Sequence, residues 1–216
     1  MGDRIISFLI FIPPILLALT IHEFFHGYVA YKLGDPTPKL AGRLTLNPLP
    51  HIDPVGFLML LIAHIGWAKP VPINPYNFRN PRSGVVYVAL AGPVSNLISG
   101  AIVGFFLRFF VNGAYPLAIS IFLQMLMAFV FISGILAFFN LIPLPPLDGW
   151  HILERFIKNP QVKYFLVSRG SIILLGIIFL SFIGLDLLGL YLRPLMKIYL
   201  KLVLGSGMVF FFVVRR

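Results

Sequence analysis

The stretch IISFLIFIPPILLALTIHEFFHGYVAYKL, residues 5–33, decides how the rest of the chain is interpreted. It is almost entirely apolar and is longer than the roughly 20 residues that a helix needs to cross a bilayer. Within it, His22, Glu23 and His26 form an ionisable cluster. A charged group near the bilayer centre costs at least ~2.5 kcal/mol, so such a cluster indicates a functional site.

A helix places residues four apart on one face, so His22 and His26 can bind the same metal ion. With Glu23 they form the pattern H-E-x-x-H, in which two imidazoles bind zinc and the glutamate acts as a general base. The distance from Ile5 to His22 is about 26 Å along a helix, so we expect both histidines deep in the membrane. The pattern predicts a catalytic zinc centre within a membrane helix.

The composition indicates a membrane protein along the whole chain. Of the 216 residues, 59% are hydrophobic and 11% charged, and the mean hydropathy is +0.95. A soluble domain carries about 25% charged residues. We therefore expect an all-α polytopic membrane protein that forms one domain over residues 1–216, with a catalytic core at about 5–190. The net charge of +10 is spread over short loops, which favours the lipid bilayer over nucleic acid as the partner.

Apolar runs separated by polar loops predict about five to six transmembrane helices. The clear spans after the first are 85–111, 116–139 and 170–188. The run 55–68 is apolar but shorter than a span. Residues 189–216 mix basic and apolar side chains, so they form either a last span or an interfacial amphipathic helix.

A third zinc ligand must come from outside the H-E-x-x-H pattern, because catalytic zinc usually has three protein ligands and one open position. The chain has no cysteine and only seven acidic residues, which leaves few candidates. We favour Asp148, which follows a span and the proline-rich turn NLIPLPPLDG, residues 140–149. Gly149 permits close approach of the backbone there. Glu154 lies in a basic stretch and is expected to be solvated.

This choice of ligand constrains the topology. His22 and His26 lie near the C-terminal end of one span, and Asp148 follows the C-terminal end of another, so the two spans must run parallel. An odd number of crossings then separates them, and 85–111 supplies one. Residues 55–68 must therefore turn back as a re-entrant or interfacial segment. The basic residues around this segment then face the cytoplasm: Lys32, Lys39, Arg43, Lys69, Arg79 and Arg82.

Three motifs carry a resemblance to a known family: HEFFH (22–26), GPVSN (92–96) and NLIPLPPLDG (140–149). With them in this order, the chain resembles the site-2 protease family of intramembrane zinc metalloproteases over about residues 5–190. It looks like the small prokaryotic members without PDZ or CBS domains. The resemblance implies hydrolysis of peptide bonds in or near transmembrane segments of protein or peptide substrates. It also implies a multi-pass protein of the cytoplasmic membrane, with the active site toward the cytoplasm.

The resemblance also implies roles for individual residues. The ligands of one Zn²⁺ ion per chain would be His22, His26 and Asp148, and Glu23 would be the catalytic glutamate. Asn140 matches an asparagine that helps to hold the substrate or the oxyanion. Asn96 matches a position near the site. The segment Leu44–Asn47 resembles a membrane-associated β segment that pairs with an unwound substrate.

Structural roles remain possible for several of these residues. Asn140 could cap a broken helix, and Asn96 could form hydrogen bonds between helices. Gly92 fits packing better than catalysis, and His51 and Asp53 fit a structural loop pair better than a shell around a ligand.

Two other classes of function also stay open. A metal-ion transporter could use His and Asp along an ion path, but here the polar residues gather at one depth. A catalytically silent membrane adaptor would be expected to lack a zinc ligand or Glu23, and neither is missing.

Overall fold

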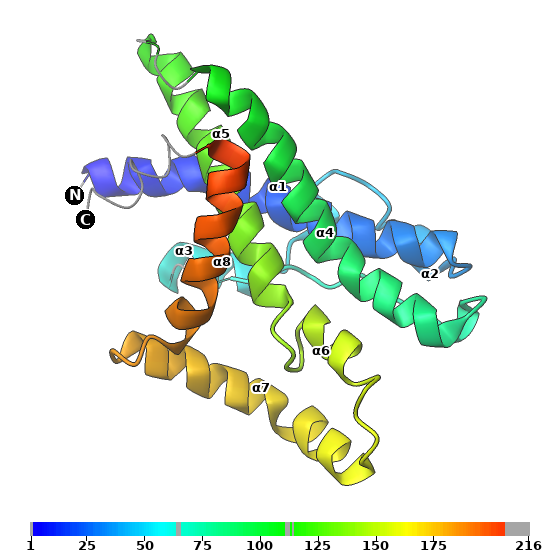
Figure 1. The fold of residues 1–216 in the computed structure, drawn as a ribbon. Helices are drawn as coiled ribbons and strands as arrows, with labels where there is room; N and C mark the ends of the chain where they lie inside the picture. Colours follow the sequence, from blue (N-terminus) through cyan, green and yellow to red (C-terminus); the bar gives the residue numbers. More distant parts are fainter. Residues whose placement is uncertain (1, 64–65, 111–112, 114, 206–216) are drawn as a thin grey trace. The chain divides into compact units, whose positions relative to one another are not determined.

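The computed structural model describes residues 2–63, 66–110, 113 and 115–205. The described residues form helices and loops without a strand, in agreement with the predicted all-α class. The chain divides into two compact units, Met1–Asn96 and Leu97–Arg216, and each is described by itself. Figure 1 shows the order of the helices along the chain, and α4 (Pro81–Leu107) contributes to both units.

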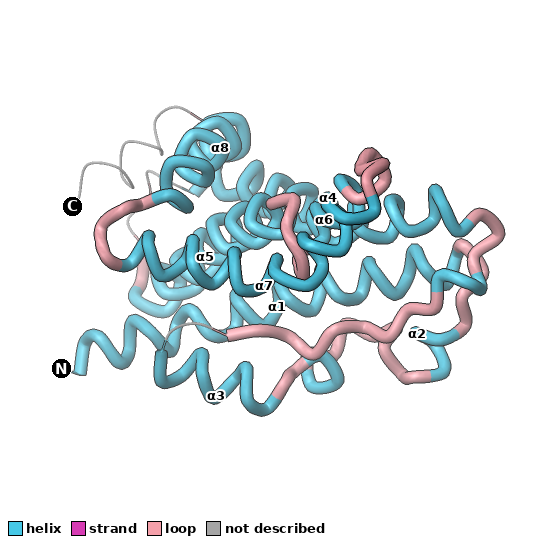
Figure 2. Tube along the Cα trace, turned by 90° about the horizontal axis from the view of Figure 1, so that it is seen from below, coloured by secondary structure: helices cyan, strands magenta, loops and turns pink. Residues whose placement is uncertain are grey.

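The first unit is built on helix α1 (Gly2–Lys32) and the first part of α4. Helix α1 continues through Pro13 and Pro14 without a break. Figure 2 shows the chain from residue 66 onward, after α3 (Pro54–Ala63), running beside α1. The short elements between α1 and α4 are α2 (Thr37–Leu40), η1 (Leu49–His51), α3 (Pro54–Ala63) and η2 (Pro75–Asn77).

The segment that contains α3 begins and ends at the same place. An antiparallel bridge joins Ile52, before α3, to Ala68, after it. Lys69 N also donates to His51 O at 2.9 Å. Helix α3 has 10 residues, too few to cross a bilayer. Within the first unit, therefore, this segment turns back as the sequence predicted.

A buried carboxylate joins the two polar loops of the first unit. Asp35 is fully buried, and its Oδ1 accepts hydrogen bonds from Thr37 Oγ1 at 2.6 Å, Thr37 N at 3.1 Å and Asn77 Nδ2 at 2.8 Å. Its Oδ2 accepts from Asn74 N at 2.7 Å. Burial alone would raise the pKa of Asp35, but these hydrogen bonds outweigh it and hold the pKa below the ordinary value of 3.8. The loops after α1 and before α4 therefore lie together.

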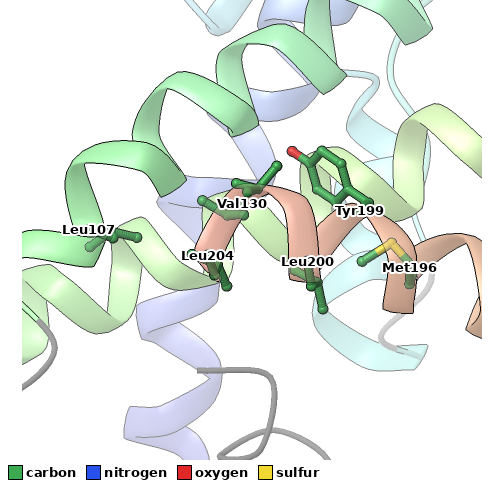
Figure 3. Packing of buried hydrophobic residues seen from close by; sticks show 7 residues of the cluster. Leu107, Val130, Met196, Tyr199, Leu200 and Leu204 are labelled. Atoms are coloured by element: carbon green, nitrogen blue, oxygen red, sulfur yellow. The ribbon is translucent and has the colours of Figure 1, made fainter. Parts of the chain in front are cut away.

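The second unit packs α8 (Leu187–Leu204) against α5 (Leu117–Asn140) and the end of α4. Helix α4 presents Gly100 and Gly104 to α8. A Cβ on Gly100 would lie 2.1 Å from Tyr199 Oη, and a Cβ on Gly104 would lie 2.1 Å from Val203 Cγ1. The missing side chains therefore permit the close approach of the two helices. Figure 3 shows the buried apolar cluster at this contact, formed by Leu107, Val130, Met196, Tyr199, Leu200, Val203 and Leu204.

The helix expected at 170–188 has different bounds in the structure, and this is a correction to the sequence analysis. Helix α7 covers Pro160–Phe182 and follows the short α6 (Asp148–Leu153). Asn159 caps α7 by accepting a hydrogen bond from Gln161 N at 2.9 Å, and Pro160 occupies the first turn. These local start signals begin the helix at residue 160, before the apolar run at 170–188.

Four described helices are long and apolar enough to cross a membrane. This number does not confirm the expected five to six spans. Helix α8 has 18 residues but carries Arg193, Lys197 and Lys201, and residues 206–216 of the expected C-terminal helix lie outside the described part. The four candidate spans are Ile10–Lys32, Pro81–Phe110, Leu117–Asn140 and Pro160–Phe182.

The short β segment expected at Leu44–Asn47 is not confirmed either. Residues 44–46 form bends in the structure, and residue 47 has no regular secondary structure. Asn47 N donates to Thr45 Oγ1 at 3.1 Å, and Thr45 O accepts from His51 Nε2 at 2.9 Å. Local side-chain bonds therefore occupy backbone groups that a strand would pair with its neighbour.

Candidate metal centre

The two histidines of the H-E-x-x-H pattern lie together on α1. Their ring centroids are 4.6 Å apart, and both side chains are buried, with 4% of His22 and 7% of His26 exposed. His26 Nδ1 lies 2.7 Å from Val88 O on α4. Because a carbonyl oxygen only accepts, Nδ1 must carry the proton, and the lone pair is on Nε2. This tautomer is the one that binds a metal through Nε2.

Helix α4 leaves room beside these imidazoles. A Cβ on Gly92 would lie 2.4 Å from His26 Nε2 and 2.7 Å from His22 Nε2. The missing side chain therefore opens a space next to the two nitrogens that can act as ligands. Two imidazole nitrogens around such a space suit a zinc ion.

Glu23 is oriented by the loop that follows α3. Its Oε2 accepts a hydrogen bond from Val71 N at 2.9 Å. The carboxylate is partly exposed, in contrast to the buried histidines on either side of it in the motif. A carboxylate held by a backbone donor next to two imidazoles can accept a proton in a defined geometry.

Asn96 belongs to the same unit as the histidines. It lies on α4 one helical turn beyond Gly92, on the same face, and is fully buried. This position is compatible both with a role near the site and with hydrogen bonding between helices.

Asp148 and Asn140 belong to the second unit. Asp148 is the first residue of α6 and is half-buried. A Cβ on Gly149 would lie 2.3 Å from Leu141 O, which explains the glycine after Asp148. Asn140 ends α5, and its Nδ2 donates to Leu136 O at 2.9 Å. The placement of both residues beside the histidines stays a prediction.

Two buried charged residues of the first unit were not identified from the sequence. Arg43 is 5% exposed and Asp35 fully buried, although both lie in a loop where charged residues are usually solvated. Thr37 is a local partner of Asp35, but the other bonds join Asp35 to residues 74 and 77 and Arg43 to residues 69 and 70, so the burial of either residue could not be found from a local motif. Asp53 has the structural role that was expected, since its Oδ1 accepts from Gly56 N at 2.7 Å at the start of α3.

The fold and the site together define a class: a multi-pass helical membrane protein with an H-E-x-x-H motif on one of its spans. Comparison with known proteins gives the family. The model of "Peptidase family M50" matches residues 113–183. "Putative zinc metalloprotease YwhC" of Bacillus subtilis (strain 168) is 44% identical over 160 residues, which cover 69% of each chain. "Putative zinc metalloprotease Rip2" of Mycolicibacterium smegmatis is 30% identical over 161 residues, 72% of this chain and 60% of the relative. No solved structure matches.

The chain therefore belongs to peptidase family M50, the site-2 proteases, and is a membrane zinc metalloprotease by family.

Proposed function

We propose that the protein hydrolyses peptide bonds in or near transmembrane segments of other membrane proteins. The observation that carries this proposal is the arrangement on α1. Two buried imidazoles one turn apart border the space left by Gly92, and the glutamate between them is held by Val71 N. This donor set lies in a helix long and apolar enough to cross a membrane, so a transmembrane substrate could reach it from within the bilayer.

The zinc ligands in this proposal are His22, His26 and Asp148. The bond from His26 Nδ1 to Val88 O supports the assignment of His26, because it directs the Nε2 lone pair to the ion. Asp148 would complete a set of two imidazoles and one carboxylate, which leaves a fourth position for water. Bound zinc would lower the pKa of that water toward ~7 and polarise the scissile carbonyl.

Glu23 is the general base. The hydrogen bond from Val71 N holds Oε2, so Oε1 can take the proton of the attacking water. The same carboxyl group then gives the proton to the leaving amine. Asn140 is the candidate donor to the developing oxyanion, and its Nδ2 must then leave Leu136 O. Asn96 has the weaker assignment of supporting the site from α4.

The centre lies toward the cytoplasmic side of the membrane in this proposal. The loop after α1 and the loop before α4 are joined through Asp35, so both lie on one side. They carry most of the basic residues of the first unit, which the positive-inside rule places in the cytoplasm.

The substitution Glu23→Gln tests the proposal. It keeps the size of the side chain but removes the base, so we expect cleavage to fall by about 10²–10⁴-fold while the zinc content stays at the wild-type level. The probe is a fluorogenic peptide with one 20-residue apolar segment, offered to the full chain in proteoliposomes. Cleavage is followed by fluorescence and product mass, and zinc by atomic absorption.

Glu154→Gln is the matched control, because the Glu154 carboxylate only forms a salt bridge in this proposal, with Oε2 at 3.0 Å from Lys163 Nζ. This variant should cleave like the wild type. If Glu23→Gln cleaves as fast as the wild type, Glu23 is not the base and the proposed mechanism is wrong.

A further inference from the structure

A buried arginine holds the loop segment that orients Glu23. Only 5% of Arg43 is exposed. Its guanidinium donates to the carbonyl oxygens of Lys69 and, at 3.2 Å, of Pro70. These two residues directly precede Val71, whose N–H donates to the Glu23 carboxylate. Arg43 therefore holds the backbone on one side of the donor that orients the carboxylate.

His51 holds the same segment from the other side. Arg43 Nη2 lies 3.5 Å from His51 Nδ1. Because arginine only donates, Nδ1 must be the acceptor, so the proton is on Nε2. His51 Nε2 then donates to Thr45 O at 2.9 Å. His51 O accepts from Lys69 N at 2.9 Å, so both backbone groups of Lys69 are bound.

Charge links Arg43 to Glu23 as well. Burial lowers the pKa of the Arg43 guanidinium, and attraction to the Glu23 carboxylate opposes part of this effect. A buried cation is costly unless it is compensated. Here two carbonyl oxygens and a nearby carboxylate provide the compensation.

We propose that Arg43 is a positioning residue for the hydrolytic reaction: its guanidinium fixes residues 69–71, so that Val71 N keeps the Glu23 carboxylate in the orientation needed to accept a proton. The inference rests on the proposed role of Glu23 as the base. Arginine suits this position because its planar fork can donate to several acceptors at once, which a lysine ammonium cannot do with the same geometry.

The test uses Arg43→Gln in the full chain, with the fluorogenic peptide and the proteoliposomes described above. A misplacement of about 1 Å in a catalytic group can cost 10²-fold in rate, so we expect kcat to fall by about 10²-fold. KM and zinc content should stay at the wild-type level, because substrate binding and the imidazoles are untouched. Lys39→Gln is the matched control: it removes one positive charge from an exposed side chain of α2, outside residues 69–71, and its kcat should not change.

A second measurement separates positioning from simple loss of structure. In Arg43→Ala, added guanidinium ions should restore part of kcat, because they can occupy the space of the lost side chain and donate to the same carbonyls. Arg43→Lys keeps the positive charge but loses the planar fork, so its kcat should stay below the wild-type value. A variant that has merely unfolded would not respond to guanidinium.

The outcomes separate the two proposals. Wild-type kcat in Arg43→Gln, with Glu23→Gln inactive, overturns the inference and leaves the proposed function intact. Loss of zinc in Arg43→Gln, without rescue of Arg43→Ala by guanidinium, shows a structural role and also overturns it. Full cleavage by Glu23→Gln overturns the role of Glu23 as the base, on which the inference rests. Absence of cleavage by the wild type overturns the proposed function itself. A double variant that is no slower than Glu23→Gln alone supports the inference, because both substitutions then act through one carboxylate.

Discussion

Gly92 sets the room available between α4 and the two histidines. The sequence marks it only as part of GPVSN, a stretch that also suits helix packing. The structure gives it a more specific role, because any side chain there would enter the space beside both Nε2 atoms. Such a residue can control metal binding without providing a ligand.

We expect Gly92→Ala to weaken zinc binding. The added Cβ would lie 2.4 Å from His26 Nε2, so at least one imidazole must move out of its ligating position. Changes that disturb ligand orientation typically cost about 10–100-fold in metal affinity. Zinc competition with a chelator would measure the loss.

Gly176→Ala is the control for Gly92→Ala, since a Cβ at Gly176 on α7 meets nothing within 4 Å. This variant should bind zinc like the wild type. Unchanged zinc affinity in Gly92→Ala would show that the metal does not use the space beside Gly92.

Single site residues could be predicted from the sequence where they lie close together along the chain. The two histidines and Glu23 lie within five positions, and helical geometry alone brings them together. Arg43 could not be found in this way, because its role depends on the bond between Glu23 and Val71, which are 48 positions apart. The third-ligand role of Asp148 remains a prediction.

The sequence predicted some helices and loops correctly and others incorrectly. The spans that begin and end at polar loops were predicted well, and 55–68 was correctly predicted to turn back. The predicted start of α7 was wrong because the capping pair Asn159–Pro160 begins the helix earlier in the chain. The strand at 44–47 was not confirmed, since the side chains of the loop itself satisfy part of its backbone.

The contact between the two loops of the first unit should depend on pH through Asp35. Its pKa is depressed in the folded protein, so the carboxylate contributes stability at neutral pH, above its unfolded pKa. That contribution is lost as the pH falls from near 3.8 toward the lower folded value. The wild type should therefore lose thermal stability below about pH 4.

Asp35→Asn tests this role of the charge. The amide cannot accept the same four hydrogen bonds, so we expect a loss of about 1–3 kcal/mol at pH 7. The difference between variant and wild type should shrink as the wild type becomes protonated. Thermal unfolding of the full chain in detergent, at pH 7 and below about pH 4, would show this. A stability difference between variant and wild type that does not vary with pH would contradict it.

For the whole molecule, composition already separated a membrane protein from a soluble one, and the four candidate spans agree with it. The number of crossings was harder to predict. A helix such as α8 combines basic residues with a buried apolar face, so length and hydropathy do not classify it. Its close approach to α4 depends on Gly100 and Gly104, which no local pattern assigns to a partner helix.

The topology can be tested with single cysteines, because the chain has none of its own. Leu40 and Tyr76 are 82% and 92% exposed, and Leu117 is 77% exposed. A membrane-impermeant maleimide should label Leu40→Cys and Tyr76→Cys from the same side of the membrane. It should label Leu117→Cys from the other side, since α4 lies between residues 76 and 117. Labelling of Leu40→Cys and Tyr76→Cys from opposite sides would contradict the return of α3.

The bridge between Ile52 and Ala68 has a practical consequence for engineering. Because the chain re-joins itself there, the number of residues between the two bridge partners is independent of the spacing of Glu23, Arg43 and Val71. An epitope tag or fluorophore inserted between Ile52 and Ala68 would leave the arrangement of Glu23, Arg43 and Val71 intact as long as the bridge closes.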